Sequence, residues 1–193
     1  AHVKKLAEIT QRQAEVKTIL GEHDSFASLA EDKFNQYLRL AEAHDLPRMV
    51  SIQNEYGLLR RYFDHDLAEV SHHEDVGLLA YSALAAGALS GKYLDGQIPK
   101  GTRGELAAGA TYRNNPHSEP AIRAYIELAQ KHGLDVCQMG LKFALDRPFM
   151  ASVIIGATNM DQLKTDIGAK DITLSDDVNK GIAEIYRQFP RPI

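Results

Sequence analysis

Residues 76–82 are Val-Gly-Leu-Leu-Ala-Tyr-Ser, an apolar run of strand length. Two similar runs lie before and after it along the chain, Arg48-Met-Val-Ser-Ile-Gln53 and Ala151-Ser-Val-Ile-Ile-Gly156. Both are rich in β-branched residues and are bounded by turn or polar residues, which favours strands buried in a sheet. The sequence therefore predicts three strands, at 48–53, 76–82 and 151–156.

Helical patterns alternate with these strands. Apolar residues recur at helical spacing in 34–41, which precedes the first strand, and in 122–129 and 137–144, which lie between the second and the third. Ser175, followed by two aspartates, predicts the start of a last helix. Strands that alternate with helices are typical of parallel βα units. We expect helices to cover one face of the sheet and further barrel core to cover the other.

The residues at the carboxyl ends of the three strands are polar, aromatic or glycine. They are Gln53-Asn54, Tyr81-Ser82 and Gly156-Ala-Thr158. In βα folds this edge of the sheet faces the ligand. We therefore expect the ligand-binding residues at this edge.

Two segments depart from the alternation. Residues 98–119 are rich in Gly, Pro, Asn and Arg, which is typical either of a binding loop or of a disordered excursion. A binding loop would bring Tyr112, Arg113 and His117 to the substrate. Residues 1–33 contain one amphipathic helical pattern and no strand, so we divide the chain into 1–33 and 34–193.

The composition excludes several classes of protein. The chain has 193 residues, of which 44% are hydrophobic and 25% charged, with a formal net charge of −4 at pH 7. This is typical of a globular protein of about one domain. No basic stripe indicates nucleic-acid binding, and neither a long apolar run nor a charged-then-apolar leader indicates a membrane span or secretion. We expect a cytoplasmic protein.

Cys137 and the pair His72-His73 are the residues that invite a redox or metal interpretation. The single cysteine lies among apolar residues, so we expect a buried structural thiol. The histidines precede Glu74-Asp75. Adjacent side chains on a helix point apart, so we expect a surface pair that favours the end of a helix.

Three strand-end motifs together resemble the aldo-keto reductase family. They are Ser51-Ile-Gln-Asn54, Ala80-Tyr-Ser-Ala-Leu-Ala85 with its continuation Leu89-Ser-Gly-Lys-Tyr93, and Ile155-Gly-Ala-Thr-Asn-Met-Asp-Gln-Leu163. They resemble the sixth, seventh and eighth strands of that family's barrel, in this order and at these spacings. The likeness runs from about residue 34 to the C-terminus and is nearest the branch of the potassium-channel β subunits and their bacterial relatives.

The resemblance implies an α/β fold of the (β/α)8 TIM-barrel type, here a partial barrel of about three to four βα units. It implies NADP(H) as cofactor and hydride transfer to a small-molecule carbonyl substrate, an aldehyde or ketone. Gln53 would bind the nicotinamide carboxamide, because an amide matches both its donor and its acceptor. Tyr81 would stack on the nicotinamide ring. Ser82, Leu84 and Ala85 would contact the pyrophosphate through backbone and hydroxyl groups.

The other implied contacts concern the phosphates and the adenosine. Lys92 and Arg103 would reach the phosphates, although surface charge is the ordinary role of such residues. Gly156, Thr158 and Gln162 would hold the adenosine end, where the exposed N–H groups that open a helix favour an anion. No Gly-x-Gly-x-x-Gly follows a strand, so a Rossmann site is not expected.

The chain also departs from the family pattern. Glu55 and Ala83 stand where the family usually has proline, and Thr165-Asp166 stands where it often has the Glu-Asn that binds adenine. Asp166 is therefore an expected cofactor contact with an altered side chain, whose carboxylate would repel phosphate slightly.

The length is a further departure, because a (β/α)8 barrel takes about 250 residues. The family's catalytic Asp, Tyr, Lys and His come from the first half of the barrel, and residues 1–33 contain no tyrosine. We therefore predict no catalytic residue in this chain and little activity on its own. The alternatives are a non-catalytic nucleotide-binding or regulatory half-barrel, in which a partner or a second copy covers the open edges, and a sequence from which the first half is missing.

Overall fold

The computed structural model describes residues 28–65, 67–106 and 115–193, without the side chains of 28–31. The chain divides into two compact units, 1–49 and 50–193, and each is described by itself. The amphipathic pattern near the N-terminus lies outside the described residues. So do Tyr112 and Arg113, two of the three residues expected to face a substrate from the long loop.

The described part of the first unit contains helix α2, Ser28–Ala43. Phe34, Leu38 and Ala41 are buried along one side of it, which confirms the helix predicted from their spacing. The helix ends in a turn in which the N–H of Leu46 donates to the carbonyl of Ala41, at 2.8 Å. Pro47 follows, and the residue before a proline disfavours the helical conformation.

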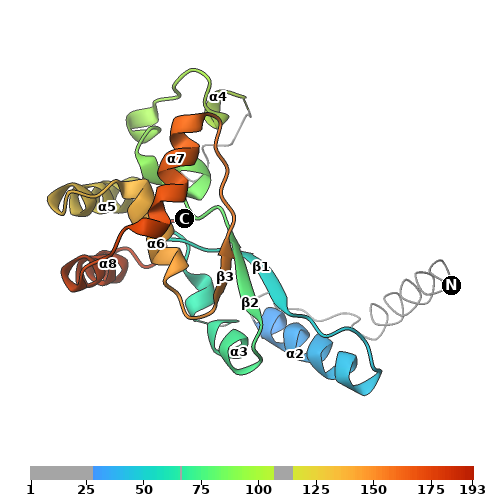
Figure 1. Ribbon diagram of the computed structural model, residues 1–193. Helices are drawn as coiled ribbons and strands as arrows, with labels where there is room; N and C mark the ends of the chain where they lie inside the picture. The colour runs from blue at the N-terminus through green and yellow to red at the C-terminus, as the bar shows by residue number, and fades with distance from the viewer. Residues whose placement is uncertain (1–27, 66, 107–114) are drawn as a thin grey trace. The chain divides into compact units, whose positions relative to one another are not determined.

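The second unit is built on a parallel sheet of strands β1 (Ser51–Glu55), β2 (Gly77–Tyr81) and β3 (Met150–Val153), in that order. All three predicted strands are present with shifted ends, and the alternation with helices is confirmed. The fold is therefore α/β with a three-stranded parallel sheet, which is consistent with part of a barrel (Figure 1).

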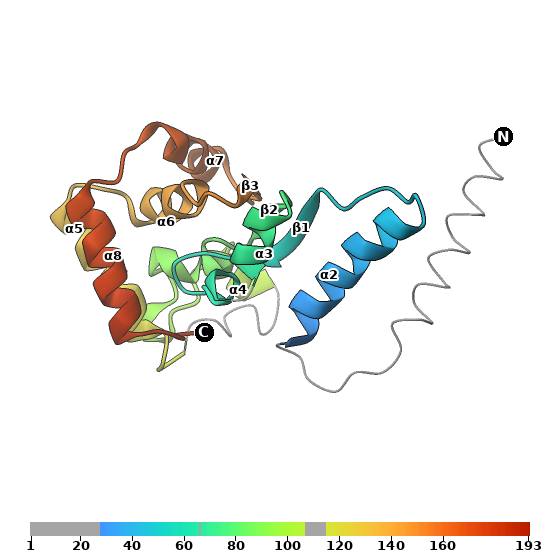
Figure 2. The same ribbon diagram turned by 90° about the horizontal axis from the view of Figure 1, so that it is seen from below.

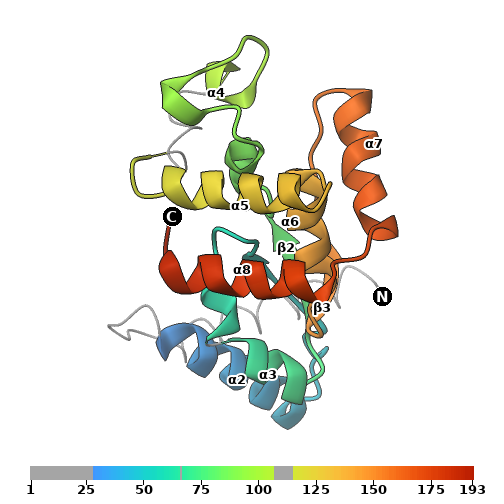
Figure 3. The same ribbon diagram turned by 90° about the vertical axis from the view of Figure 1, so that its left-hand side faces the viewer.

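Helices and short 3-10 turns connect and follow the strands. In chain order they are η1 (Tyr62–Asp64), α3 (Leu67–His73), η2 (Ala85–Ser90), η3 (Leu94–Gly96), α4 (Arg103–Leu106), α5 (Glu119–Lys131), α6 (Val136–Leu145), α7 (Met160–Gly168), η4 (Ala169–Asp171) and α8 (Asp176–Gln188). Figure 2 shows α5, α6 and α8 on one side of the sheet, and Figure 3 shows α5 and α8 running side by side.

Local side-chain caps explain where three of these helices begin. The carboxylate of Asp135 accepts the N–H groups of Cys137 and Gln138 at the start of α6. Asn159 accepts from the third residue of α7, and Ser175 caps α8 as predicted from the sequence. Each cap satisfies amide groups that have no partner within the helix.

The covered face of the sheet, which carries Ile52, Leu78, Ala80 and Val153, packs into the hydrophobic core. Leu78 and Ala80 have no exposed surface, and the core continues into α5, α6 and α8 through residues such as Tyr125. Alternation along each strand sends the intervening side chains to the opposite face.

The open face carries Gln53, Leu79, Tyr81 and Ser152. Gln53, Leu79 and Ser152 form one row across the sheet, because each is in register with the next. Gln53, Tyr81 and Ser152 are exposed and Leu79 is half-buried. Further barrel core was expected against this face, and nothing in the described part of residues 50–193 covers it.

The irregular stretch 98–119 contains one short helix, α4, which the sequence did not predict. A residue that precedes the helix holds its backbone, because the N–H of Gly104 donates to the phenol of Tyr93 at 3.2 Å. Residues 107–114 are outside the described range, so neither interpretation of this stretch is tested.

Candidate functional site

Gln53 and Tyr81 present polar and aromatic groups on the open face near the ends of β1 and β2. Tyr81 is in register with Glu55, two residues beyond Gln53, and its side chain is 37% exposed. A rise of about 3.3 Å per residue and a strand spacing of about 4.8 Å put the two Cα atoms roughly 8 Å apart. An amide and an aromatic ring at that separation can both contact one heteroaromatic amide.

The loop after β2 begins with a tight backbone turn. Ser82, Ala85 and Ala86 all have left-handed backbone angles, with φ between 51° and 56°, and Gly87 follows at 92°. Such angles are unfavourable for residues other than glycine, and they are found where a structure must hold a particular backbone arrangement. The turn is closed by Leu84, whose carbonyl accepts from Gly87 at 2.9 Å and from Leu89 at 3.3 Å.

This turn leaves some of its backbone N–H groups without a backbone acceptor. The N–H of Ala85 donates to the carbonyl of Ser82 at 2.7 Å, and the Ala85 side chain is buried. Among the described residues, the amides of Ser82 and Leu84 have no backbone acceptor. The N–H groups of Ser82 and Leu84 have no backbone hydrogen bond to give up before they donate to an anion. The N–H of Ala85 would first have to break its hydrogen bond to the carbonyl of Ser82.

Gly57, in the loop after β1, packs against the backbone of this turn. A Cβ added at this residue would lie 2.4 Å from the carbonyl oxygen of Ala83. The loop after β1 therefore passes directly against the backbone of the loop after β2. Sequence reasoning missed this residue, and the only signal was a glycine two residues beyond a strand.

Lys92 and Arg103 are brought to one region by Tyr93. The ammonium of Lys92 lies 5.2 Å from the centre of the Tyr93 ring. It is folded back toward Gly87, since a Cβ added there would be 2.7 Å from Nζ. Arg103 is exposed at the start of α4, which the Tyr93 phenol anchors through Gly104.

Thr158 and Gln162 are joined at the start of α7. The side-chain oxygen of Gln162 accepts from the N–H of Thr158 at 2.9 Å and from its hydroxyl at 3.0 Å. Asn159 accepts from the N–H of Gln162, at 2.9 Å. Gly156 precedes them in open space, because an added Cβ would meet nothing within 4 Å.

Asp166 lies one turn further along α7 and is only 8% exposed. Burial and the negative charge of Asp135 raise its pKa above the ordinary carboxyl value. Burial, assisted by Asp135 and Asp166, also raises the pKa of the Cys137 thiol to about 12, while Lys92 partly opposes this. Cys137 is half-buried where a buried thiol was expected, and a raised pKa leaves less of the reactive thiolate at neutral pH.

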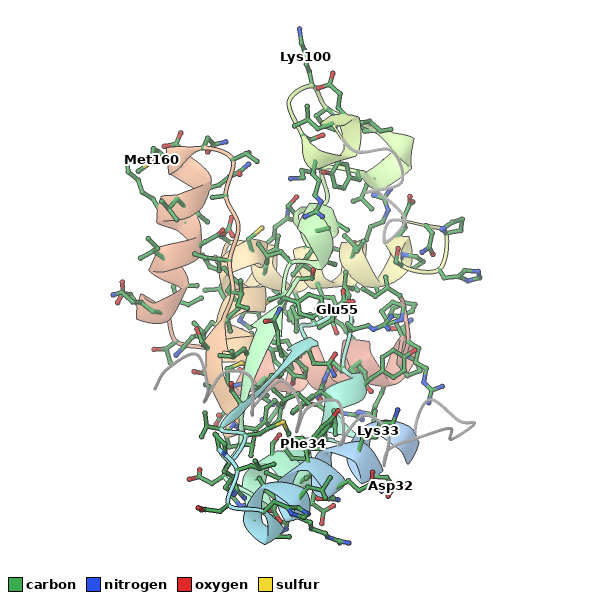
Figure 4. All side chains as sticks on the ribbon, turned by 90° about the vertical axis from the view of Figure 1, so that its right-hand side faces the viewer. Asp32, Lys33, Phe34, Glu55, Lys100 and Met160 are labelled. Carbon is green, nitrogen blue, oxygen red and sulfur yellow. The ribbon has the colours of Figure 1, made fainter. Side chains whose placement is uncertain are left out.

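Apart from Gln53 and Tyr81 on the sheet, the predicted residues form two groups on either side of α6. The loop after β2 carries one group, and the start of α7 carries the other. Ala83, Leu141 and Ala169 pack together, so the β2 loop, α6 and the turn after α7 form one assembly. Figure 4 shows Lys100, in the loop before α4, and Met160, at the start of α7, at the same end of this unit, with Glu55 lower in the view than both.

A part-buried polar network in the loop after β1 was also missed in the sequence. The Tyr56 phenol donates to Asp64 at 2.7 Å, and Nε of Arg61 donates to the other carboxylate oxygen at 2.6 Å. Burial and the nearby carboxylate raise the pKa of Tyr56, so the phenol stays protonated. The network fixes the loop after β1, and its role is structural.

The histidine pair that invited a metal interpretation is not part of this site. His72 and His73 are exposed in the last turn of α3, with Nε2 of His73 3.9 Å from Glu69. No group of three or more His, Cys, Asp or Glu side chains in the described residues is placed to hold a metal ion. No helix in the same part of the chain has the length and apolar character needed to span a membrane.

Comparison with known proteins places residues 31–187 within the sequence profile described as "Aldo/keto reductase family". Protein tas of Escherichia coli (strain K12) is 48% identical over 157 residues, which are 81% of this chain and 45% of that protein. L-glyceraldehyde 3-phosphate reductase of the same organism is 30% identical over 166 residues, 82% of this chain and 46% of that protein.

A third relative is the putative voltage-gated potassium channel subunit beta of Schizosaccharomyces pombe. It is 28% identical over 162 residues, 80% of this chain and 47% of that protein. The chain spans about half the length of the curated relatives it matches.

Proposed function

The chain belongs to the aldo/keto reductase family, and we propose that it forms the cofactor-binding half of an NADP(H)-dependent carbonyl reductase. The comparisons confirm the family and the branch that the strand-end motifs indicated. The substrate class is an aldehyde or ketone. The observation that supports this most is the exposure of Gln53 and Tyr81 together on the open face at the strand ends.

The residues present fit the chemistry of a nicotinamide dinucleotide. Gln53 would pair with the carboxamide through its own amide, and Tyr81 would lie against one face of the nicotinamide ring so that the other face meets the substrate. When bound, NADPH supplies the hydride. The role of this chain is to orient the ring and to shield it on one side.

The phosphate contacts follow from the two groups on either side of α6. The free amides of Ser82 and Leu84, together with Lys92 and Arg103, would bind the pyrophosphate. At the start of α7 the Gln162 oxygen is already used by Thr158, so its amide nitrogen is the group that can donate to the adenosine end. Gly156 leaves room for the backbone to approach that end.

Asp166 makes a weaker case as a cofactor contact. It lies on the same side of α7 as Gln162, one turn later, but it is buried toward Asp135 and Cys137. We keep it at the edge of the adenosine site. Its carboxylate oxygens can accept a hydrogen bond from the adenine there.

Titration of the full chain with NADPH and NADH, followed by nucleotide fluorescence, tests this proposal. We expect saturable binding of NADPH and weaker binding of NADH. Absence of saturable binding of either nucleotide would contradict the proposal.

A second measurement concerns activity. We propose that the residues of this chain lack the family's proton-transfer group, so that the chain alone turns over slowly or not at all with NADPH and a panel of aldehydes. Robust turnover by the purified chain would show that a proton donor is present in it.

The exposed open face favours one alternative function, a nucleotide-binding or regulatory half-barrel that pairs with a partner or a second copy. Within residues 50–193, Tyr81 is exposed on this face, and Val50, Ile154 and Ile155 are exposed next to the strands. β1 and β3 each have one strand neighbour among the described residues, and such edges favour pairing. Sedimentation equilibrium tests pairing with a second copy, and a monomer at all concentrations would contradict that form of the alternative.

A further inference from the structure

Helix α7 lies beside α6 but is held there by few side chains (Figure 2). In α7, all of whose residues the structure describes, Asp166 is the one side chain that is buried. Met160, Gln162 and Ile167 are exposed, and the helix adds none of its residues to the main hydrophobic core. Apolar packing alone therefore does not determine how α7 lies against α6.

Helix α6, by contrast, is fixed in the core. Met139, Phe143 and Ala144 are buried among the core residues. The first turn of α6 is capped by Asp135, whose carboxylate accepts the N–H of Gln138 at 2.9 Å. A side chain at the start of α6 therefore extends from a backbone of defined position.

The side chain of Gln138 joins the two helices. Its Nε2 donates to the backbone carbonyl of Thr165 at 3.0 Å. Thr165 is fourth from the end of α7, and the last four carbonyls of a helix lack their regular intrahelical partner. The N–H of Ala169, which would be that partner, bonds to carbonyl groups nearer the helix end. The amide of Gln138 therefore satisfies this carbonyl from outside the helix.

Gly168 leaves the space that this hydrogen bond needs. A Cβ added at Gly168 would lie 2.8 Å from Nε2 of Gln138, which is closer than such atoms approach in proteins. The backbone of Gly168 has an ordinary right-handed helical conformation, with φ −62° and ψ −17°. The conformation therefore does not require glycine, whereas the contact with Gln138 requires a residue without a Cβ.

The hydrogen bond connects the core with the residues proposed to hold the adenosine. It reaches α7 three residues after Gln162, which belongs to that group. At the other end of the helix Ala169 packs against Ala83 and Leu141. Ala169 thus fixes the end of α7 that is farther from the proposed adenosine site, and Gln138 fixes the helix nearer to it.

We infer that Gln138 is a positioning residue for the cofactor, because its hydrogen bond to Thr165 sets how the start of α7 lies relative to α6 and the loop after β2. One dinucleotide then reaches the contacts on both sides of α6. Gln138 acts through the backbone of α7 and is assigned no contact with the cofactor. The inference rests on the proposed function, since it takes the start of α7 as the adenosine site.

The test compares Gln138→Met with the unmodified full chain, because methionine keeps the length of the side chain and removes the donor. NADPH binding, followed by nucleotide fluorescence, should weaken about fivefold, as expected for the loss of one hydrogen bond. Binding of reduced nicotinamide mononucleotide should be unchanged, because this half of the cofactor does not reach α7. Hydrogen exchange at the backbone amides of residues 160–168 should be faster in the variant.

Gly168→Ala is a second variant that removes the same hydrogen bond, because the new Cβ displaces the Gln138 amide. NADPH binding should weaken to a similar extent. Alanine favours a helix more than glycine does, so the melting temperature should stay close to that of the unmodified chain. A purely structural contact would lower stability and affinity together. The double variant Gln138→Met, Gly168→Ala should bind NADPH no more weakly than either single variant.

Gln130→Met is the matched control. Gln130 is exposed on α5, which carries no residue of the proposed site, so the same exchange there should leave NADPH affinity and exchange in α7 unchanged.

The inference is overturned if Gln138→Met binds NADPH as tightly as the unmodified chain, if it loses affinity equally for NADPH and for reduced nicotinamide mononucleotide, or if exchange in α7 does not change. It is also overturned if the losses of the two single variants add in the double variant. Absence of NADPH binding by the unmodified chain would contradict the proposed function and this inference with it, whereas the outcomes above contradict this inference alone.

Discussion

The two faces of the sheet differ in almost every respect although they belong to the same three strands. On the covered face Leu78 and Ala80 are fully buried against helices. On the open face Gln53, Tyr81 and Ser152 meet solvent, and the groups that reach it are an amide, a phenol and a hydroxyl. The covered face accounts for the stability of the unit, and the open face offers the groups that can bind a ligand.

The difference also shows how three parallel strands can support a hydrophobic core on one face alone. The helices α5, α6 and α8 give the covered face a complete core without help from the open face. The open face can therefore stay free for a cofactor or for further strands.

Substitution of Leu78 by alanine gives the largest expected effect. The side chain is fully buried, so its removal should lower the free energy of unfolding by about 2–5 kcal/mol. Gln53→Ala on the open face should change it by less than about 0.5 kcal/mol. Urea denaturation measures both, and similar losses for the two variants would show that the faces are not different in stability.

Substitution of Gly57 by alanine tests the contact that supports the loops at the strand ends. The new Cβ would lie 2.4 Å from the Ala83 carbonyl oxygen, so we expect a loss of about 1–3 kcal/mol. Gly156→Ala, at a residue with open space around it, is the matched control and should be close to neutral. If thermal unfolding finds both variants equally stable, the two loops are not in tight contact.

Substitution of Asn159 by alanine removes the cap of α7. The lost hydrogen bond to the N–H of Gln162 should cost about 1 kcal/mol. Asn159→Asp keeps an acceptor at the same place and should retain most of the stability. Equal stability of the alanine variant and the unmodified chain in urea would mean that another group caps the helix.

The smallest expected effect is a pH dependence at Asp166. Because its pKa is raised in the folded chain, ionised Asp166 destabilises the fold at neutral pH. The penalty should disappear as the pH falls below the ordinary value of 3.8, where the unfolded chain is protonated as well. Asp166→Asn should therefore be slightly more stable than the unmodified chain at pH 7 and equally stable at pH 3.

A control for that comparison is Asp161→Asn, which removes a carboxylate from the first turn of α7. A negative charge there favours the helix, so this variant should be slightly less stable at pH 7. If Asp166→Asn is also less stable at pH 7, the carboxylate is better solvated than its burial indicates.

The sequence predicted the strands because their signal is local. An apolar run such as 76–82 differs from its neighbours whatever it packs against, and β2 spans 77–81. The ends were less accurate, since Val50 continues the apolar run of the first strand yet is 74% exposed before β1 begins. The cap at Ser175 was predictable for the same reason, because the capping residue and its target are three positions apart.

The parts that were not predicted depend on residues far apart in the chain. α4 has no apolar period, and its position depends on the phenol of Tyr93, 11 residues before Gly104. The burial of Asp166 depends on how α7 packs against the start of α6. The contact of Gly57 with Ala83 and the network of Tyr56, Asp64 and Arg61 likewise exist only after the loops meet.

The most direct test of the central claim is the NADPH affinity of Tyr81→Ala compared with that of Tyr37→Ala. The two residues are 37% and 40% exposed, and Tyr37 lies on α2, in the unit that contributes no residue to the proposed site. We predict that Tyr81→Ala weakens NADPH binding about tenfold, since stacking of a base on an aromatic side chain contributes about 1–3 kcal/mol, and that Tyr37→Ala leaves it unchanged. Equal affinities for the two variants would contradict the assignment of the open face as the nicotinamide site.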